Sequence, residues 1–227
     1  MCGGFPNKPK ILKGAFVEFG LSIPPLIVPF QFNPESIARD RYNYFSVPSG
    51  DQTLRQFYQQ ENNADLIRLR DTQSVSIELE TISFELRLDA TDKLDEGDPI
   101  TEQFGIEPQL STLELMVHSK GESLLGEALG SLLGSSGGFS FTRGSNPPMI
   151  LFIWGRKRVL PVNINSMSIS ETEFNTDLNP IRATVSVSLT VIEGKNMVYK
   201  YSKAMKEAMS VLNLANLTNI ADVIIPG

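Results

Sequence analysis

The chain has 227 residues, of which 41% are hydrophobic, and its formal net charge at neutral pH is −6. This length and hydrophobicity suffice for one large or two small folded domains, and they exclude a wholly disordered chain. The acidic balance argues against nucleic-acid binding, which needs a clustered basic surface, and the single cysteine, Cys2, excludes an internal disulfide.

Two strands are predicted near the N-terminus. The first covers residues 11–20, and the second covers residues 26–32. The second strand should lie near a sheet edge, because Pro29 cannot donate a backbone hydrogen bond to a neighbouring strand. It should end at the turn-forming pair Asn33-Pro34, since proline pushes the residue before it away from helical backbone angles.

Two arginines, Arg39 and Arg41, follow this turn, and residues 46–73 are then polar. We predict a long loop or a loosely held hairpin over this stretch, and loops of that length usually have a function or become ordered on binding. The two arginines either contribute to a contact between subunits or are solvent-exposed cations beside a turn.

Residues 75–89 alternate between apolar and polar side chains, but the phase of the alternation slips between Leu79 and Ile82. Since a slip of one residue would turn every later side chain to the wrong face, the sequence predicts either a β-bulge near Glu80-Thr81 or two short strands that meet there. We favour the bulge.

A helix is predicted over residues 108–119. Pro108 suits the first turn of a helix, and Leu110, Leu113 and Val117 recur at helical spacing. This helix is the clearest one in the first half of the chain.

Glycine recurs at every fourth position within residues 123–138, inside a Gly-rich loop that we place at 120–146. Leu124 and Leu125 lie in this repeat. The stretch is either a marginal amphipathic helix in a flexible loop or a segment that becomes ordered against a neighbouring subunit, with these leucines at the contact.

Three further strands are predicted. Residues 147–155 form an apolar run that is typical of a strand buried on both faces, and Trp154 should be largely buried. Residues 156–174 hold a basic turn and a strand whose phase slips near residues 165–166. Residues 177–193 show the cleanest alternation in the chain.

An amphipathic helix is predicted over residues 195–212, with lysines on its polar side. The tail that follows is apolar, so we expect it to pack on its own domain or on a partner. The helix and tail either dock a partner or cover the edge of the sheet. The candidate contact residues of the tail are Leu214, Leu217, Ile220 and Val223.

No catalytic motif stands out. The chain has one histidine, His118, without a cluster of partner residues around it, and residues 92–99 lack the ligand spacing of an EF-hand, so we predict a solvent-exposed acidic loop there. We expect no enzyme activity, no cofactor and no metal site. Without a signal peptide or a membrane-length apolar run, the protein is expected in the cytosol until assembly.

Several stretches in order resemble the tube-domain proteins of contractile injection systems, which are phage-tail-like particles. They are VPFQFNPESI, LRLDATD, PPMILFIWG and FNTDLNPIRATVSVSLTVIE. The resemblance covers about residues 11–200 and is closest to the subunits that join the inner tube to the spike and baseplate. The residues that carry most of it are Phe32, Asn33, Pro34, Trp154, Gly155, Asn179, Pro180 and Arg182, with Leu178 and Ile181 in the same run.

The resemblance implies a mainly β fold with minor α, namely a tail-tube-like antiparallel β-sandwich or barrel with one packed helix and a C-terminal helix. The Gly- and Pro-rich residues 1–10 predict a flexible N-terminus. The tube-type β domain is then expected at 11–194, and the C-terminal helix and tail at 195–227. The resemblance also implies a homo-oligomeric ring, with six copies, whose partners are inner tube subunits, the spike or hub protein and baseplate components. No nucleic acid and no membrane insertion are implied, and the particle is either released or membrane-attached.

Four functions remain open at this point. In the first, the chain is a subunit of an adaptor ring between the spike and the inner tube. In the second, it is an inner tube subunit or tube initiator. The number of copies per particle would distinguish these two functions. The third alternative is a cell-wall-binding baseplate accessory. Similar proteins commonly continue into a LysM module, for which the 227 residues leave no room, and this weighs against the third alternative. The fourth alternative is a β-sandwich binding module unrelated to such particles.

Overall fold

The computed structural model describes residues 12–20, 26–47, 53–60, 65–118 and 146–215. The expectations for residues 1–10, for Leu124 and Leu125, and for Leu217, Ile220 and Val223 lie outside these ranges. The side chain of Leu214 also lies outside the described part, although its backbone is helical. The strands are β1 (Ala15–Glu18), β2 (Ile27–Pro29), β3 (Ala38–Asp40), β4 (Asn43–Ser46), β5 (Ser74–Ile77), β6 (Thr81–Asp89), β7 (Ile150–Trp154), β8 (Arg158–Phe174) and β9 (Pro180–Val191). The helices are α1 (Leu54–Tyr58), α2 (Leu66–Thr72), α3 (Thr91–Asp95), α4 (Pro99–Phe104), α5 (Glu107–Val117) and α7 (Met197–Ala215).

Alternation of apolar and hydroxyl side chains builds the centre of the sheet. On β9, Val185, Val187 and Leu189 are buried, while the intervening serine and threonine side chains face the other way. Strand β6 has the same alternation and pairs with β9 in antiparallel register over its whole length, from Thr81 to Asp89. The predicted strands at 147–155, 156–174 and 177–193 are therefore present, and the fold is mainly β with minor α.

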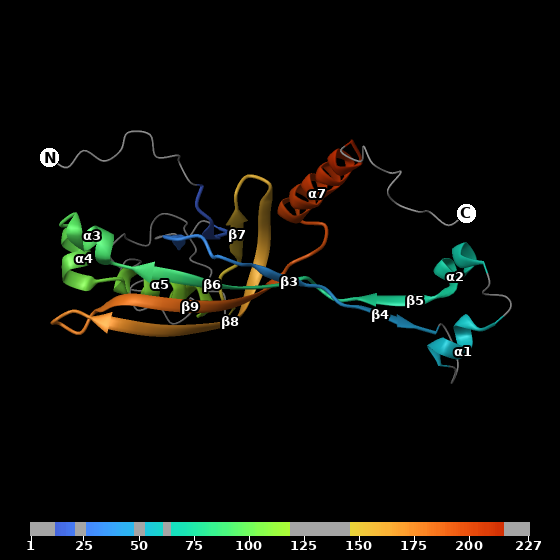
Figure 1. Ribbon diagram of the computed structural model, residues 1–227, viewed down its shortest axis with the longest axis horizontal. Coiled ribbons are helices and arrows are strands. Elements are labelled where there is room, and N and C mark those ends of the chain that lie inside the picture. Colours follow the sequence, from blue (N-terminus) through green and yellow to red (C-terminus); the bar gives the residue numbers. More distant parts are fainter. Residues whose placement is uncertain (1–11, 21–25, 48–52, 61–64, 119–145, 216–227) are drawn as a thin grey trace, which may run out of the picture.

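Seven antiparallel strands form one sheet in the order β2-β1-β7-β8-β9-β6-β3. Strand β8 is long enough to belong to both parts of the sheet, since its first residues pair with β7 and the remainder pairs with β9. The register shifts between Ile164 and Ser166, which confirms the predicted phase slip. An extra residue in one strand increases the local bend, and the sheet curls at this strand (Figure 1).

The core lies inside the curl. Phe16 of β1 and Phe152 of β7 both contact Phe84 of β6, with ring centroids 6.0 and 5.3 Å apart. Two halves of a single sheet therefore face each other, as the layers of a sandwich do. Helix α5 closes this core with Leu110 and Leu113, as predicted, and with Met116, which takes the buried position that we had expected for Val117.

Strands β2 and β3 are the edges of the sheet. The position of β2 confirms the expectation drawn from Pro29. Beyond β2 the side chain of Gln31 bridges to β6: its amide oxygen accepts a hydrogen bond of 2.9 Å from the Asp89 backbone N–H, and its amide nitrogen donates to the Asp89 carbonyl. The Gln31 side chain thus binds the backbone N–H and carbonyl of Asp89, which a neighbouring strand would otherwise bind.

Strands β4 and β5 leave the body as a separate two-stranded ribbon that carries α1 and α2 (Figure 1). We call residues 42–79 the arm. Residues 46–73, predicted as a long loop or a loosely held hairpin, connect β4 to β5, and their described part contains α1 and α2. The β-bulge that we favoured near Glu80 is wrong, because β5 and β6 are two strands in different sheets, and the alternation slips where the chain passes from one to the other.

Two other expectations are corrected. Residues 92–99 are largely exposed, as predicted, but they are not a loop throughout. Helix α3 ends at Asp95, and the Asp98 side chain caps α4 by accepting a hydrogen bond from the Thr101 backbone N–H. Trp154 is only partly buried, and β7 is fully buried on one face alone, through Ile150 and Phe152. Trp154 shares the face of Ile150 and Phe152 but lies at the end of β7, where it packs against the core from one side.

Helix α7 lies against the start of β8, where β9 has already ended. The hydroxyl of Ser202, a residue 1% exposed, accepts a hydrogen bond from the Val159 N–H and donates one to the Val159 carbonyl. The helix therefore satisfies backbone groups that a neighbouring strand would otherwise bind, so it covers an edge of the sheet. Within the described residues no helix is long and apolar enough to span a membrane.

Candidate functional site

The asparagines of the two Asn-Pro pairs hold loops together. The Asn33 side chain accepts a hydrogen bond of 3.0 Å from the Gly14 N–H and donates one of 2.9 Å to the Leu12 carbonyl, so it fixes the chain before β1. The Asn179 side chain donates a 2.8 Å bond to the Gln103 carbonyl at the end of α4. Both side chains therefore have structural roles.

The other residues of the resemblance also stabilise connections. Pro180 is buried, and its carbonyl accepts a hydrogen bond from the Ile106 N–H before α5. Arg182 bonds Asp89 and Glu173, each at 2.7 Å. Gly155 turns the chain between β7 and β8 with a φ of 67°, a conformation that glycine adopts without steric cost.

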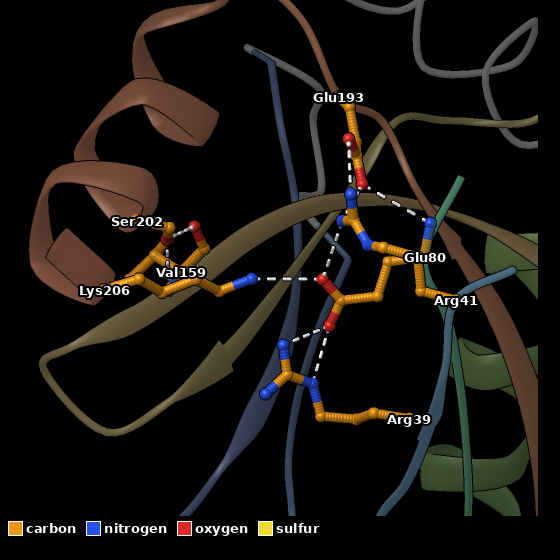
Figure 2. A network of polar contacts seen from close by, with 7 residues as sticks. All are labelled: Arg39, Arg41, Glu80, Val159, Glu193, Ser202 and Lys206. Atoms are coloured by element: carbon orange, nitrogen blue, oxygen red, sulfur yellow. Dashed lines mark hydrogen bonds and ion pairs between the residues drawn. The ribbon is translucent and has the colours of Figure 1, made fainter. Parts of the chain in front are cut away.

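Arg39 and Arg41 meet a buried carboxylate at the root of the arm (Figure 2). Glu80, 3% exposed, lies between β5 and β6. Its carboxylate accepts hydrogen bonds from Arg39 Nε at 2.6 Å, from Arg41 at 3.3 Å and from Lys206 of α7 at 3.0 Å. Arg41 also pairs with Glu193, which follows β9. Neither arginine is an unpaired cation beside a turn.

This network joins segments that are far apart in the sequence. Burial alone would raise the pKa of Glu80, but the hydrogen bonds from Lys206 and Arg39 outweigh it and leave this pKa below its ordinary value. The carboxylate is therefore ionised and holds the end of β3, the start of β6 and α7 together. Beside it, between β3 and α7, lies an open pocket of about 560 Å³ that Lys203 and Tyr199 also line.

The arm presents an apolar face that nothing in the described chain covers. Phe45 is paired with Val75 across the ribbon, and Ile77 lies on the same face two residues along. These side chains are 44%, 41% and 63% exposed, and Leu79 is 51% exposed. An isolated two-stranded hairpin is only marginally stable in water, so this face needs a partner to become buried.

The face of the sheet opposite the core is lined by small hydroxyl groups. Rows of side chains run across β6, β9 and β8, among them Ser83, Ser188 and Ser166. They line a groove of about 970 Å³, which Phe32, Asn33 and Pro34 border on one side. Its charged members include both signs, for example Glu85 and Arg87, so the wall is polar without a dominant charge.

Within the described residues no group of three or more histidine, cysteine, aspartate or glutamate side chains is placed to hold a metal ion. The sequence analysis had not identified Glu80, Glu193, Tyr199 or Lys206 as members of a common site. A usable signal for the site was Glu80 itself, because this glutamate lies where the alternation of apolar side chains slips between Leu79 and Ile82. Its partners lie 39 to 126 positions away, a separation that no local pattern reveals.

No protein-family model matches the sequence, and no curated protein shows significant similarity to it.

Proposed function

We propose that this chain is a structural subunit of a contractile injection system. It forms a ring that connects the central spike and baseplate hub to the inner tube and templates assembly of the tube. The proposal rests on the ordered set of stretches that resemble tube-domain proteins, together with the arm. Six copies in the ring and the partners named above belong to the same proposal.

The apolar face of the arm is the observation that carries the proposal. The arm extends from the body and pairs with no strand of it, while Phe45, Val75 and Ile77 remain exposed. A projecting element that a second copy covers makes a head-to-tail contact, and such contacts close into rings when the rotation between copies permits. The arm is suited to this task because its own fold leaves its apolar side free.

The hydroxyl-lined groove fits the same proposal. In a ring around a channel, one surface of each copy lines the channel and contacts water and any molecule that passes through it. Small hydroxyl side chains, such as those along β9, form no large apolar patch to which a passing molecule would bind. The charged side chains around them carry both signs, so the surface has no strong electrostatic field of one sign. We propose this face as the channel wall.

An inner tube subunit or tube initiator is the alternative, because it would use the same contacts. Electron microscopy of the assembled particle separates the two: an adaptor is present as one ring per particle, and a tube subunit as many. A copy located in the particle without lateral neighbours would contradict both.

The arm is tested by two substitutions at adjacent positions of β5. Ile77→Lys places a charge on the apolar face, and we expect the protein to fold with an unchanged melting temperature, since Ile77 is 63% exposed, but to be excluded from particles. Ser76→Lys, on the opposite face of the same ribbon, is the matched control and should still be incorporated. Normal incorporation of the Ile77→Lys protein would show that this face of the arm is not buried between copies.

A further inference from the structure

The turn between β8 and β9 exposes a leucine in an unfavourable backbone conformation. Leu178 has a φ of 64° and is 80% exposed. A left-handed conformation is disfavoured for a residue with a Cβ atom, and glycine or asparagine would adopt it more easily. The backbone hydrogen bonds of this turn place position 178 in the left-handed conformation, but glycine or asparagine would form the same turn without exposing an apolar side chain.

The turn is also held rigidly. The Asn175 side-chain oxygen accepts hydrogen bonds from the backbone N–H groups of Asp177, at 3.0 Å, and Asn179, at 2.8 Å. The backbone closes through Asn175 N–H to the Asn179 carbonyl, at 2.9 Å, and Leu178 N–H to the Asn175 carbonyl, at 3.0 Å. Asn179 is further bonded to α4. An apolar side chain fixed in this way loses little entropy when it inserts into a partner, which is the character of an interface anchor.

The surroundings of Leu178 indicate what partner the turn fits. Helix α4, to which the turn is bonded, exposes Ile100 and Phe104. The adjoining residues 91–107 contain six carboxylates and one lysine, and the Asp177 side chain forms no ion pair within the described residues. The complementary surface should therefore be apolar at its centre and basic around it.

Helix α7 has such a surface on the side that does not touch β8. The exposed side chains recur at spacings of four and three residues, as along a coiled-coil seam. They are Met197, Tyr201, Ala204, Ala208 and Val211. Tyr201 lies at the border of this face, since its hydroxyl donates a hydrogen bond of 2.9 Å to the Arg156 carbonyl before β8. Met197 and Val211 are 79% and 65% exposed. The two alanines are smaller than their neighbours along this row, and Lys200, which is also exposed, lies one turn before Ala204.

We propose that the β8–β9 turn of one copy docks on the outer face of α7 of a second copy, with Leu178 inserted at Ala204 and Ala208 and Asp177 facing Lys200. The two surfaces lie in different parts of the body, with α5 and the sheet between them (Figure 1), so they meet only between copies. The contact is head-to-tail, and it rests on the proposed ring function because it supplies a second contact between neighbours.

The experiment measures self-association of the full chain by sedimentation velocity over a range of concentrations. Leu178→Gly should leave the melting temperature unchanged or raise it, because glycine relieves the strain, while association weakens by roughly 30-fold, as for loss of an interface anchor. Leu178→Met retains an apolar side chain and should associate nearly as the natural protein does. This pair separates a lost contact from a lost fold.

Charge exchange tests the second half of the contact. Asp177→Lys and Lys200→Asp should each weaken association, and the double variant should restore it in part. In assembled particles, a carbodiimide should cross-link Asp177 of one copy to Lys200 of the next. If the single variants weaken association and the double variant restores nothing, the assignment to α7 is wrong.

The two proposals fail in different ways. If the natural protein associates and forms rings but Leu178→Gly associates equally well, the docking of this turn is wrong and the ring remains. If the natural protein stays monomeric at every concentration and has no neighbouring copy in particles, the ring and the docking contact are both wrong. Loss of association by Ile77→Lys alone would leave the arm as the sole contact.

Discussion

Phe84 and Phe152 lie with their ring centroids 5.3 Å apart, although β9 and β8 separate their strands in the sheet. In a flat sheet, three strand spacings would place them about 14 Å apart. The contact therefore exists only because the sheet curls at β8, and it makes Phe152 a residue on which both halves of the fold depend.

Phe152→Ala should lower the free energy of unfolding by about 3–5 kcal/mol, as is typical for a fully buried phenylalanine, since Phe152 is 0% exposed. Trp154→Ala should cost less, about 1–3 kcal/mol, because Trp154 is only partly buried and packs against Phe30 and Phe152 from the rim of the core. Urea denaturation of both variants measures the difference. An equal or larger loss for Trp154→Ala would place it in the centre of the core.

Glu80→Gln should destabilise the chain by about 3 kcal/mol, the range expected when one partner of a buried ion pair is removed. The amide keeps the size of the side chain but leaves Arg39, Arg41 and Lys206 without their shared carboxylate. The control is Glu35→Gln, whose ion pair with Arg87 is exposed and should contribute less than about 1 kcal/mol. Similar urea midpoints for the two variants would contradict a stabilising role of the network.

Acid should unfold the protein in part through Glu80 and Asp89. Burial opposes ionisation of both, but hydrogen bonds from Lys206 and Arg39, and from Thr91 and Arg182, lower the pKa of each in the folded state. Their stabilisation is therefore present above the unfolded pKa of about 4 and is lost as pH falls through the lowered folded values. Glu80→Gln should flatten the fall in unfolding free energy over that acidic range, and an unchanged slope would show that Glu80 does not contribute.

Ser202→Ala should loosen α7 from the body. The substitution leaves the N–H and carbonyl of Val159 without the hydroxyl that binds both, at a cost of about 1–3 kcal/mol. Faster hydrogen exchange of the α7 amides, with little change in β9, is the expected signature. Ser210→Ala, an exposed serine of the same helix, should leave exchange unchanged, and equal effects of the two would mean that Ser202 is not the attachment.

The sequence predicted the elements whose signal is periodic and long. The alternation on β9, the phase slip in β8, and helices α5 and α7 were all recognisable, because a repeated contact with the core imposes a repeated residue pattern. The end of the arm was not recognisable, since a phase slip before Ile82 would arise both from a bulge and from a chain that passes from one sheet to another. Helices α3 and α4 are too short to show a period, and local capping by Asp98 stabilises α4.

The candidate site was predicted only in part. Arg39 and Arg41 were selected because they follow a turn, but their environment depends on Glu80, Glu193 and Lys206, which the fold brings from other parts of the chain. Trp154 was expected deep in the core because its strand is apolar throughout, whereas it is the last residue of β7 and lies at the rim of the core. Such information is tertiary and does not appear in a local pattern.

Strand β8 determines how the molecule should unfold. Because its first residues pair with β7 and its later ones with β9, neither half of the sheet can lose β8 without exposing the other half. The body should therefore unfold as one cooperative unit, and its slowest-exchanging amides should lie in β8 and β9 together. The arm shares no ladder with β8, so its amides should exchange by local opening in the free subunit and become protected on assembly.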